Sequence, residues 1–475
     1  MSEIYSEAFQ SLLERKLVRV RYLMTKGAMH RLGIRDFDSA IANQNFLQEC
    51  HAVYKKAQSI MTTAMLAMES EIKRLSGQPE VHKLKYWLRL FESCFESFVW
   101  IALSGGDVSE VYKGPKFGDL VSQNIASVLG YTKHFNENPY SFSIPLDFTR
   151  YSCIADVLTV EISETTKKAT VNFIELKEGA VNGAMLAATE THTSEAWKEF
   201  LDKYGEKGFK QAERFFRAGL EFHERNKQIN AAPGVYKTKK GARIVAPASN
   251  TPQRFTSRVE HLCDLARRGD YAVEIIDECL LVAALDTSER TKYLRAQFDA
   301  RLLALNAFIT EEDTSKWEPD RIVSALKQVE FTNWIDGVGY MGLFPALLRP
   351  ITTRNFLDLC FGRVELLFYF HAPNFLHRCR LAGLHAGFLS KKRTNRLRAK
   401  QGWRSQDYPL WDGRAMAYMI DGHPMVMGSM RQNDMIFNWL TPSSAVETLV
   451  SSNSNMPADS FARLNNLTEK DLEDR

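Results

Sequence analysis

The sequence lacks the cysteine patterns of a disulfide-stapled or zinc-binding protein. Its seven cysteines are scattered, none forms a CxxC pair, and most lie among apolar residues. An odd number of scattered cysteines predicts buried thiols in a reducing compartment. No run approaches the roughly eighteen apolar residues of a membrane span, and the amphipathic first residues carry no signal-peptide core. We therefore expect a cytoplasmic protein with no membrane partner.

Several sequence motifs of common enzymes are also missing. There is no GxxxxGK[ST] loop for a nucleoside triphosphate and no GxSxG elbow of a serine hydrolase. His371, His377, Cys379 and His385 lie close together in the chain, but their spacing matches no common zinc-ligand pattern. A large excess of one sign of charge is lacking too, because the net charge is only +4. Any surface for nucleic acid must therefore be a local patch.

What is present is ordinary globular composition, with 45% hydrophobic and 25% charged residues over 475 positions. This length predicts two to four domains. Residues 1–110 are expected to be helical, with a stripe of buried methionine and aromatic residues on the helices. Residues 111–290 are expected to form a central domain, 291–455 a mixed helical and basic domain, and 456–475 a tail.

The stretch Tyr151–Gly179 is typical of two β-strands joined by a polar turn. Both strands are rich in β-branched and apolar residues, and the segment SETTKKAT between them is polar. Asp156 opens the first strand, and the triplet Glu175-Leu176-Lys177 closes the second. Residues two apart in a strand share a face, so Glu175 and Lys177 point the same way. Antiparallel pairing would bring Asp156 beside them at one edge of the sheet.

Two carboxylates and an ammonium group would then converge. Carboxylates plus water are the ligands that a hard divalent cation such as Mg²⁺ prefers. A neighbouring lysine can orient or deprotonate a water molecule, or neutralise charge that develops on a phosphate. The alternative is a solvated strand end, since the Glu-x-Lys spacing occurs three times, at Glu14–Lys16, Glu71–Lys73 and Glu175–Lys177. The first two lie in helical patterns, where residues two apart do not face each other.

The Asp156 strand and the Glu175-Leu176-Lys177 triplet resemble the core of the PD-(D/E)XK nuclease superfamily, the restriction-endonuclease-like fold. The resemblance covers residues 115–290, and its specific part is under about thirty residues long. It implies an α/β fold with a central mixed β-sheet, flanked by a helical N-terminal region and a mixed α/β C-terminal region. It also implies that Asp156, Glu175 and the Leu176 carbonyl hold Mg²⁺ or Mn²⁺. Lys177 would act on the attacking water, and Gln211, which matches a glutamine on the following helix, would orient the lysine or the water.

The segments around this hairpin complete the expected sheet. Tyr140–Phe148 is predicted to be the strand before it, with Pro145 at an edge or a bulge. Tyr271–Leu285 is predicted to be a second hairpin, with its turn at Asp277-Glu278, that completes the same sheet. Further along, Asn355–Phe370 is strongly apolar and is predicted to be one helix.

The densest basic stretch of the chain is SKKRTNRLRAKQGWRS. Positive residues interleaved with an aromatic residue are typical of a surface that binds phosphates and stacks bases. The alternative is a solubilising helix or loop. The predicted nucleic-acid-binding residues are Lys391, Lys392, Arg393, Arg396, Arg398 and Lys400.

Together these features predict a Mg²⁺-dependent endonuclease that acts on DNA. Three alternatives stay open: a nuclease-like fold that binds nucleic acid without cutting it, a scaffold protein, and an RNA nuclease. By analogy alone, the extra helical and basic regions suit a bacterial restriction or anti-phage defence effector. Such an effector would have a homo-oligomer or a defence complex as its partner.

Overall fold

A computed structural model describes two compact units of the chain, Met1–Ala232 with Phe344–Leu348, and Pro233–Leu343 with Arg349–Arg475. The described residues are 2–32, 44–103, 125–150, 152, 155–163, 165, 169–176, 180–191, 193–229, 234–238, 241–245, 253–310, 314–334, 346–401, 410–420, 423–427, 432, 435–454 and 472–473. The division between Ala232 and Pro233 differs from the predicted boundaries near residues 110 and 290.

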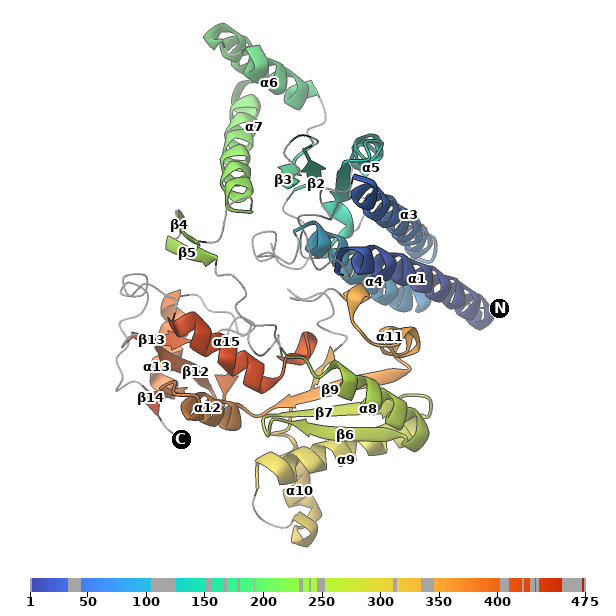
Figure 1. Ribbon diagram of the computed structural model, residues 1–475, viewed down its shortest axis with the longest axis vertical. Helices are drawn as coiled ribbons and strands as arrows, with labels where there is room; N and C mark the ends of the chain where they lie inside the picture. Colours follow the sequence, from blue (N-terminus) through green and yellow to red (C-terminus); the bar gives the residue numbers. More distant parts are fainter. Residues whose placement is uncertain are drawn as a thin grey trace. The chain divides into compact units, whose positions relative to one another are not determined.

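Helices make up most of the first unit. They are α1 (Ser2–Leu32), α3 (Gln44–Arg74), α4 (Glu80–Ala102), α5 (Ile125–Phe135), α6 (Ala180–Thr191) and α7 (Ser194–Ile229), with a short 3-10 helix, η5 (Ala346–Leu348), against α1 and α4. Helices α1, α3 and α4 pack side by side (Figure 1). The predicted stripe is buried on these helices, with Met61, Met65 and Phe91 fully enclosed. The expectation of a helical N-terminal region is confirmed.

A three-stranded sheet follows these helices in the first unit. Its strands are β1 (Ser141–Pro145), β2 (Val157–Ile162) and β3 (Ala169–Ile174), in the order β1-β2-β3 and antiparallel throughout. Strand β1 is buried along its whole length, and Gln58 of α3 donates a 3.0 Å hydrogen bond to the Ser143 carbonyl. Pro145 ends β1, because proline lacks the N–H that a longer strand would need, and the 3-10 helix η2 (Leu146–Phe148) follows.

Helices α6 and α7 come after β3 and pack on each other around Met185 and Phe200. Helix α7 bends at Gly205, whose φ of 54° lies in the left-handed region that favours glycine.

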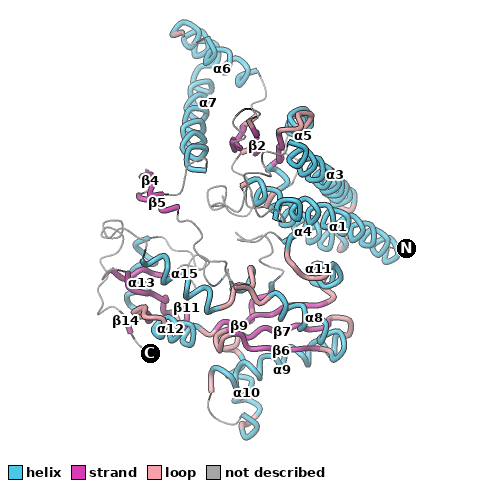
Figure 2. The backbone as a smooth tube through the Cα atoms, in the orientation of Figure 1, coloured by secondary structure: helices cyan, strands magenta, loops and turns pink. Residues whose placement is uncertain are grey.

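The second unit contains a four-stranded antiparallel sheet of order β6-β7-β9-β8 (Figure 2). Its strands are β6 (Tyr271–Ile276), β7 (Leu280–Asp286), β8 (Thr332–Asn333) and β9 (Val364–Phe370). Leu281, Ala283 and Leu285 of β7 pack against the alanines of α9 (Arg290–Phe308). Alternate residues of a strand face opposite ways, so the even-numbered residues of β7 face α8 (Thr256–Gly269) on the other side (Figure 1).

A second sheet of the same unit has the order β11-β12-β10-β14, with β13 paired to β12. Its strands are β10 (Ala386–Leu389), β11 (Leu410–Trp411), β12 (Arg414–Ile420), β13 (His423–Val426) and β14 (Leu472–Glu473). The remaining elements are the hairpin β4 (Gly234–Thr238) and β5 (Gly241–Val245), the 3-10 helix η3 (Thr314–Lys316), and the helices α10 (Pro319–Leu326), α11 (Thr353–Cys360), α12 (Ala372–Leu381), α13 (Lys391–Gln401) and α15 (Pro442–Ser454).

The α/β class of the chain is as predicted, but two expectations about its strands are corrected. Every strand pair that the structure describes is antiparallel, whereas a mixed central sheet was expected. The hairpin Tyr271–Leu285 forms with its turn at Asp277-Glu278, yet it pairs with β9 in the second unit and does not extend β1-β2-β3. A turn sets the pairing inside a hairpin, but only the whole fold selects the next strand.

The predicted helix over Asn355–Phe370 is also corrected. The chain forms the short helix α11, reverses at Gly362 with a φ of 68°, and continues as the central strand β9. A strand that is buried on both faces reads as a continuous apolar run, so its periodicity does not distinguish it from a buried helix. Among the described helices, none is both long enough and apolar enough to cross a membrane.

Candidate functional site

The hairpin β2–β3 brings the two predicted acids to one end of the sheet. Its register pairs Val157 with Ile174, so one further step along both strands puts Asp156 opposite Glu175. The Asp156 amide donates a 3.1 Å hydrogen bond to the Ile174 carbonyl, which extends the pairing beyond β2. Residues directly opposite in an antiparallel pair share a face. Both side chains are half-buried.

The Asp156 carboxylate is held against the triplet by a backbone contact. Its Oδ2 accepts a 2.5 Å hydrogen bond from the Leu176 amide. A backbone N–H that donates to a carboxylate oxygen fixes the position of that oxygen. The contact therefore orients the Asp156 carboxylate toward the strand end that carries Glu175.

Two predicted members of the site have other surroundings or cannot be placed. Lys177 lies outside the described residues. Gln211 lies on α7, and its Nε2 donates a 2.8 Å hydrogen bond to Asn182 Oδ1 of α6. This bond fixes α7 against α6, a role that the sequence did not predict.

The donor set at the strand end suits a magnesium ion. Mg²⁺ in proteins is bound by one or two carboxylates and keeps several waters. Asp156 and Glu175 supply two carboxylates, and Leu176, the residue after Glu175, adds a backbone carbonyl. Within the part of the chain that the structure describes, no three His, Cys, Asp or Glu side chains gather at one point. The described part of the site is therefore an acid pair.

The predicted nucleic-acid-binding residues lie on α13 in the second unit. Thr394 and Leu397 form the buried face of this helix, and Thr394 Oγ1 accepts a 3.1 Å hydrogen bond from the Ala415 amide. Lys392 and Arg396, four residues apart, are exposed on the opposite side. Of the others, Lys391 is exposed, Arg393 and Arg398 are half-buried, and the Lys400 side chain lies outside the described residues.

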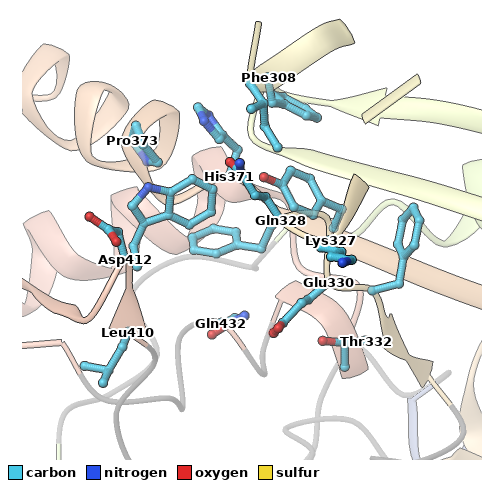
Figure 3. Close-up of a pocket in the computed structure, with 15 residues that line it drawn as sticks. Phe308, Lys327, Gln328, Glu330, Thr332, His371, Pro373, Leu410, Asp412 and Gln432 are labelled. Carbon is cyan, nitrogen blue, oxygen red and sulfur yellow. The ribbon is translucent and has the colours of Figure 1, made fainter. Parts of the chain in front are cut away.

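A pocket of about 870 Å³ in the second unit was not predicted from the sequence (Figure 3). It lies where β9 ends, and its aromatic wall contains Phe308, Phe331, Tyr369, His371 and Trp411. These residues come from α9, the segment before β8, the end of β9, and β11. One local signal was readable: a histidine followed by Ala-Pro at the end of an apolar run marks the end of β9 and the start of α12.

Four of the buried cysteines are poor nucleophiles. Burial raises the pKa of the Cys94, Cys263, Cys279 and Cys379 thiols to about 12. A thiol with that pKa remains protonated at neutral pH, and the thiolate is the reactive form. All six cysteines of the described residues are buried and free, as predicted, and Cys153 lies outside them.

Comparisons of the chain with protein-family models, with curated proteins and with solved structures found no match. The candidate sites are therefore interpreted from their own residues and geometry.

Proposed function

We propose that the chain is a metal-dependent nuclease that hydrolyses phosphodiester bonds, with DNA as the favoured substrate. The observation that supports this function best is the pairing of β2 with β3. It sets Asp156 opposite Glu175, and the Asp156 carboxylate accepts a hydrogen bond from the Leu176 amide within the triplet. An Asp that lies opposite the Glu of a Glu-x-Lys strand end is the arrangement that the PD-(D/E)XK resemblance implies.

Each residue of this strand end has a chemical task in the proposal. Asp156, Glu175 and the Leu176 carbonyl would hold Mg²⁺ or Mn²⁺. When bound, such an ion lowers the pKa of a water molecule and stabilises charge on a phosphate. Lys177 would orient the attacking water or stabilise developing charge. Gln211 would act at a distance, by keeping α7 against α6 through Asn182.

A second candidate function is nucleic-acid binding without cleavage. It is favoured by α13, whose exposed Lys392 and Arg396 share one face of a helix that is anchored to β12. Positive side chains of this kind bind backbone phosphates with a strong dependence on salt concentration. The same helix would serve a nuclease as a surface that holds its substrate.

The test is cleavage of plasmid DNA, single-stranded DNA and RNA by the purified full chain with Mg²⁺, Mn²⁺ or EDTA. Glu175→Ala and Lys177→Ala are compared with Glu161→Ala. Glu161 is an exposed acid on the same hairpin, opposite Thr170 at the other end of β2. Circular dichroism checks that every variant folds.

Metal-dependent cleavage that is lost in Glu175→Ala and Lys177→Ala but kept in Glu161→Ala is the expected result. Cleavage that survives both site substitutions would assign the activity to another part of the chain. Wild-type protein that binds nucleic acid without cutting it under any metal condition would favour the binding function.

A further inference from the structure

The aromatic side chains that line the pocket at the end of β9 pack against one another, one pair stacked and two pairs edge to face. The His371 ring stacks on Phe308, with 5.0 Å between ring centroids and an interplanar angle of 25°. Trp411 meets His371 edge-on at 5.1 Å and 85°, and it meets Tyr369 at 6.3 Å and 62°. Rings that are arranged in this way can stack on a flat ligand with one wall and enclose its edge with another.

The same wall carries a hydrogen-bonding group that the protein does not use. Tyr369 is 3% exposed and His371 is 7% exposed. Among the described residues, the Tyr369 hydroxyl has no hydrogen-bond partner, whereas the His371 ring has a hydrogen bond with Asn374. Buried polar groups nearly always have partners, so the unpartnered hydroxyl at this pocket points to a ligand that supplies one.

Burial also keeps these two groups uncharged. It lowers the pKa of His371 to about 4, against a smaller opposing effect of a hydrogen bond with Asn374. It raises the pKa of Tyr369. At neutral pH the pocket wall therefore presents a phenol and a neutral imidazole, each of which can donate or accept one hydrogen bond.

The charges at the pocket do not favour a cationic ligand. Lys327, Glu330 and Asp412 line it together with the neutral Gln328 and Gln432 (Figure 3). Asp412 forms an ion pair with Lys391 at 3.0 Å, which offsets its charge. An aromatic cage for a quaternary ammonium uses ring faces and needs no hydrogen-bonding wall. A planar, uncharged heterocycle uses both the rings and the polar groups.

A source of positive charge adjoins the pocket. The Lys391–Asp412 ion pair joins the first residue of α13 to the turn that follows Trp411. Lys392 is the next residue of α13 and is exposed. A ligand whose flat ring lies against Trp411 can therefore extend an anionic group toward the first turn of α13.

We propose that this pocket binds the base of a nucleotide. Trp411 and Phe308 stack on the ring, Tyr369 bonds its edge, and Lys392 faces its phosphate. A free nucleotide and an unstacked base of a single-stranded nucleic acid share this chemistry. The inference does not depend on the proposed nuclease activity, since its residues lie in the second unit and its test measures binding.

The first experiment is isothermal titration calorimetry on the full chain without divalent metal. The probes are AMP, GMP, CMP and UMP, their nucleosides, inorganic phosphate and choline. We expect saturable binding of at least one nucleotide, weaker binding of its nucleoside, and none of phosphate or choline. Binding of choline in preference to every nucleotide would overturn the proposal in favour of a cation cage. No binding of any nucleotide or nucleoside would also overturn it.

Two variants assign the binding to this pocket. Tyr369→Phe keeps the ring and removes only the hydroxyl, so we expect about tenfold weaker nucleotide binding, the contribution of one hydrogen bond. The free protein should not lose stability, because the hydroxyl has no partner to lose. Tyr271→Phe is the matched control, since Tyr271 packs on the same core but does not line the pocket.

Trp411→Ala removes a wall of the pocket, and we expect a loss of at least about tenfold from stacking. Trp317→Ala is its control, because Trp317 packs on the same core away from the pocket. Equal affinity in wild type, Tyr369→Phe and Trp411→Ala would contradict the assignment. If Trp411→Ala does not fold, the comparison of Tyr369→Phe with Tyr271→Phe tests the assignment by itself.

Oligonucleotides distinguish a free nucleotide from a base in a single-stranded nucleic acid as the ligand. Ten-residue oligodeoxyadenylate and oligodeoxythymidylate are titrated beside the mononucleotides, into wild type and Tyr369→Phe. Tighter binding of an oligonucleotide that Tyr369→Phe weakens would identify single-stranded nucleic acid as the ligand. Oligonucleotide binding that is unchanged by Tyr369→Phe, with weakened mononucleotide binding, would identify a free nucleotide.

Discussion

The hairpins β2–β3 and β6–β7 are similar in strand length and pairing, but β3 is an edge strand of its sheet and β7 is an inner strand. Each joins two antiparallel strands of six or seven residues. Strand β3 is the last strand of its sheet, and its residues alternate between buried and more exposed positions. Strand β7 lies between β6 and β9 and is buried from Leu280 to Leu285.

The difference explains where each unit carries polar chemistry. The edge hairpin ends in half-buried acids, because its strand ends remain close to water and a charge is tolerated there. In the sheet β6-β7-β9-β8 the two middle strands are buried over most of their length, with Glu365 of β9 half-buried. The pocket lies where β9 ends, next to His371. An edge strand open to water would suit the proposed hydrolysis, and the more enclosed end of β9 would suit the proposed nucleotide base.

The largest effect is expected when charge is removed from the edge hairpin β2–β3. Asp156→Asn keeps an oxygen for the Leu176 amide but removes the negative charge. We expect loss of metal-dependent cleavage on the order of 10²–10³-fold and little change in stability. Asp156→Ala should lose the same activity and also about 1–2 kcal/mol of unfolding free energy, because the Leu176 amide loses its acceptor. Cleavage assays and urea denaturation measure the two effects, and equal activity of Asp156→Asn and wild type would contradict the site.

Truncating one side chain in each hairpin tests the difference in burial. Leu281 of β7 is fully buried, so Leu281→Ala should cost about 2–5 kcal/mol of unfolding free energy. Ile174 of β3 is half-buried, and Ile174→Ala should cost about half as much or less. Denaturant unfolding of both variants measures the costs. Equal costs would show that the edge strand is as well packed as the central one.

Acid should act on the second unit through His371. Its folded-state pKa of about 4 lies below the ordinary value of 6.5. The stability that comes from the neutral imidazole is therefore fully present above pH 6.5 and declines as the pH falls from 6.5 toward 4. After allowance for solvent screening, we expect about 2 kcal/mol to be lost over this window.

His371→Gln should remove this part of the pH dependence. The measurement is the difference in unfolding free energy between wild type and His371→Gln at pH 7 and pH 4.5. A difference that does not change with pH would mean that His371 does not titrate in this window. Lys327, Glu330 and Asp412 line the same pocket in both proteins, so their own titration cancels in the difference.

The smallest expected change in unfolding free energy concerns the turn of the hairpin β6–β7. Asp277 and Glu278 have φ values of 48° and 56°, which favour glycine. Glu278→Gly should raise the unfolding free energy by about 0.5–1 kcal/mol, because it relieves the strain of a residue with a Cβ in this region. The exposed carboxylate that Glu278→Gly removes pairs with Arg378 only at 3.7 Å. Asp277→Gly is the contrast, because its carboxylate accepts a 2.9 Å hydrogen bond from the Ser443 amide. A thermal melt that shows no gain for Glu278→Gly would mean that the turn is unstrained.

Local elements were predictable because their signals are local. The hairpin turn at Asp277-Glu278 follows from residue type and spacing. The predicted strand Tyr140–Phe148 is shorter in the structure, because β1 ends at Pro145 and a 3-10 helix follows. The pairing of Asp156 with Glu175 follows from the turn between β2 and β3 in the same way. The bond between Gln211 and Asn182 was not predictable, since it depends on how α6 packs on α7.

The sequence by itself determined most helices and hairpins of this protein, the acid pair of the edge hairpin and the basic face of α13. Contacts between residues two to four apart decide the helices and the basic face, and the pairing inside one hairpin decides the acid pair. Only the tertiary structure decided that β7 pairs with β9, that Val364–Phe370 is a strand, and that Phe308, Tyr369 and Trp411 share a pocket. Burial brings these segments together across long stretches of chain, and a buried apolar run does not record in its own residues which partner will cover it.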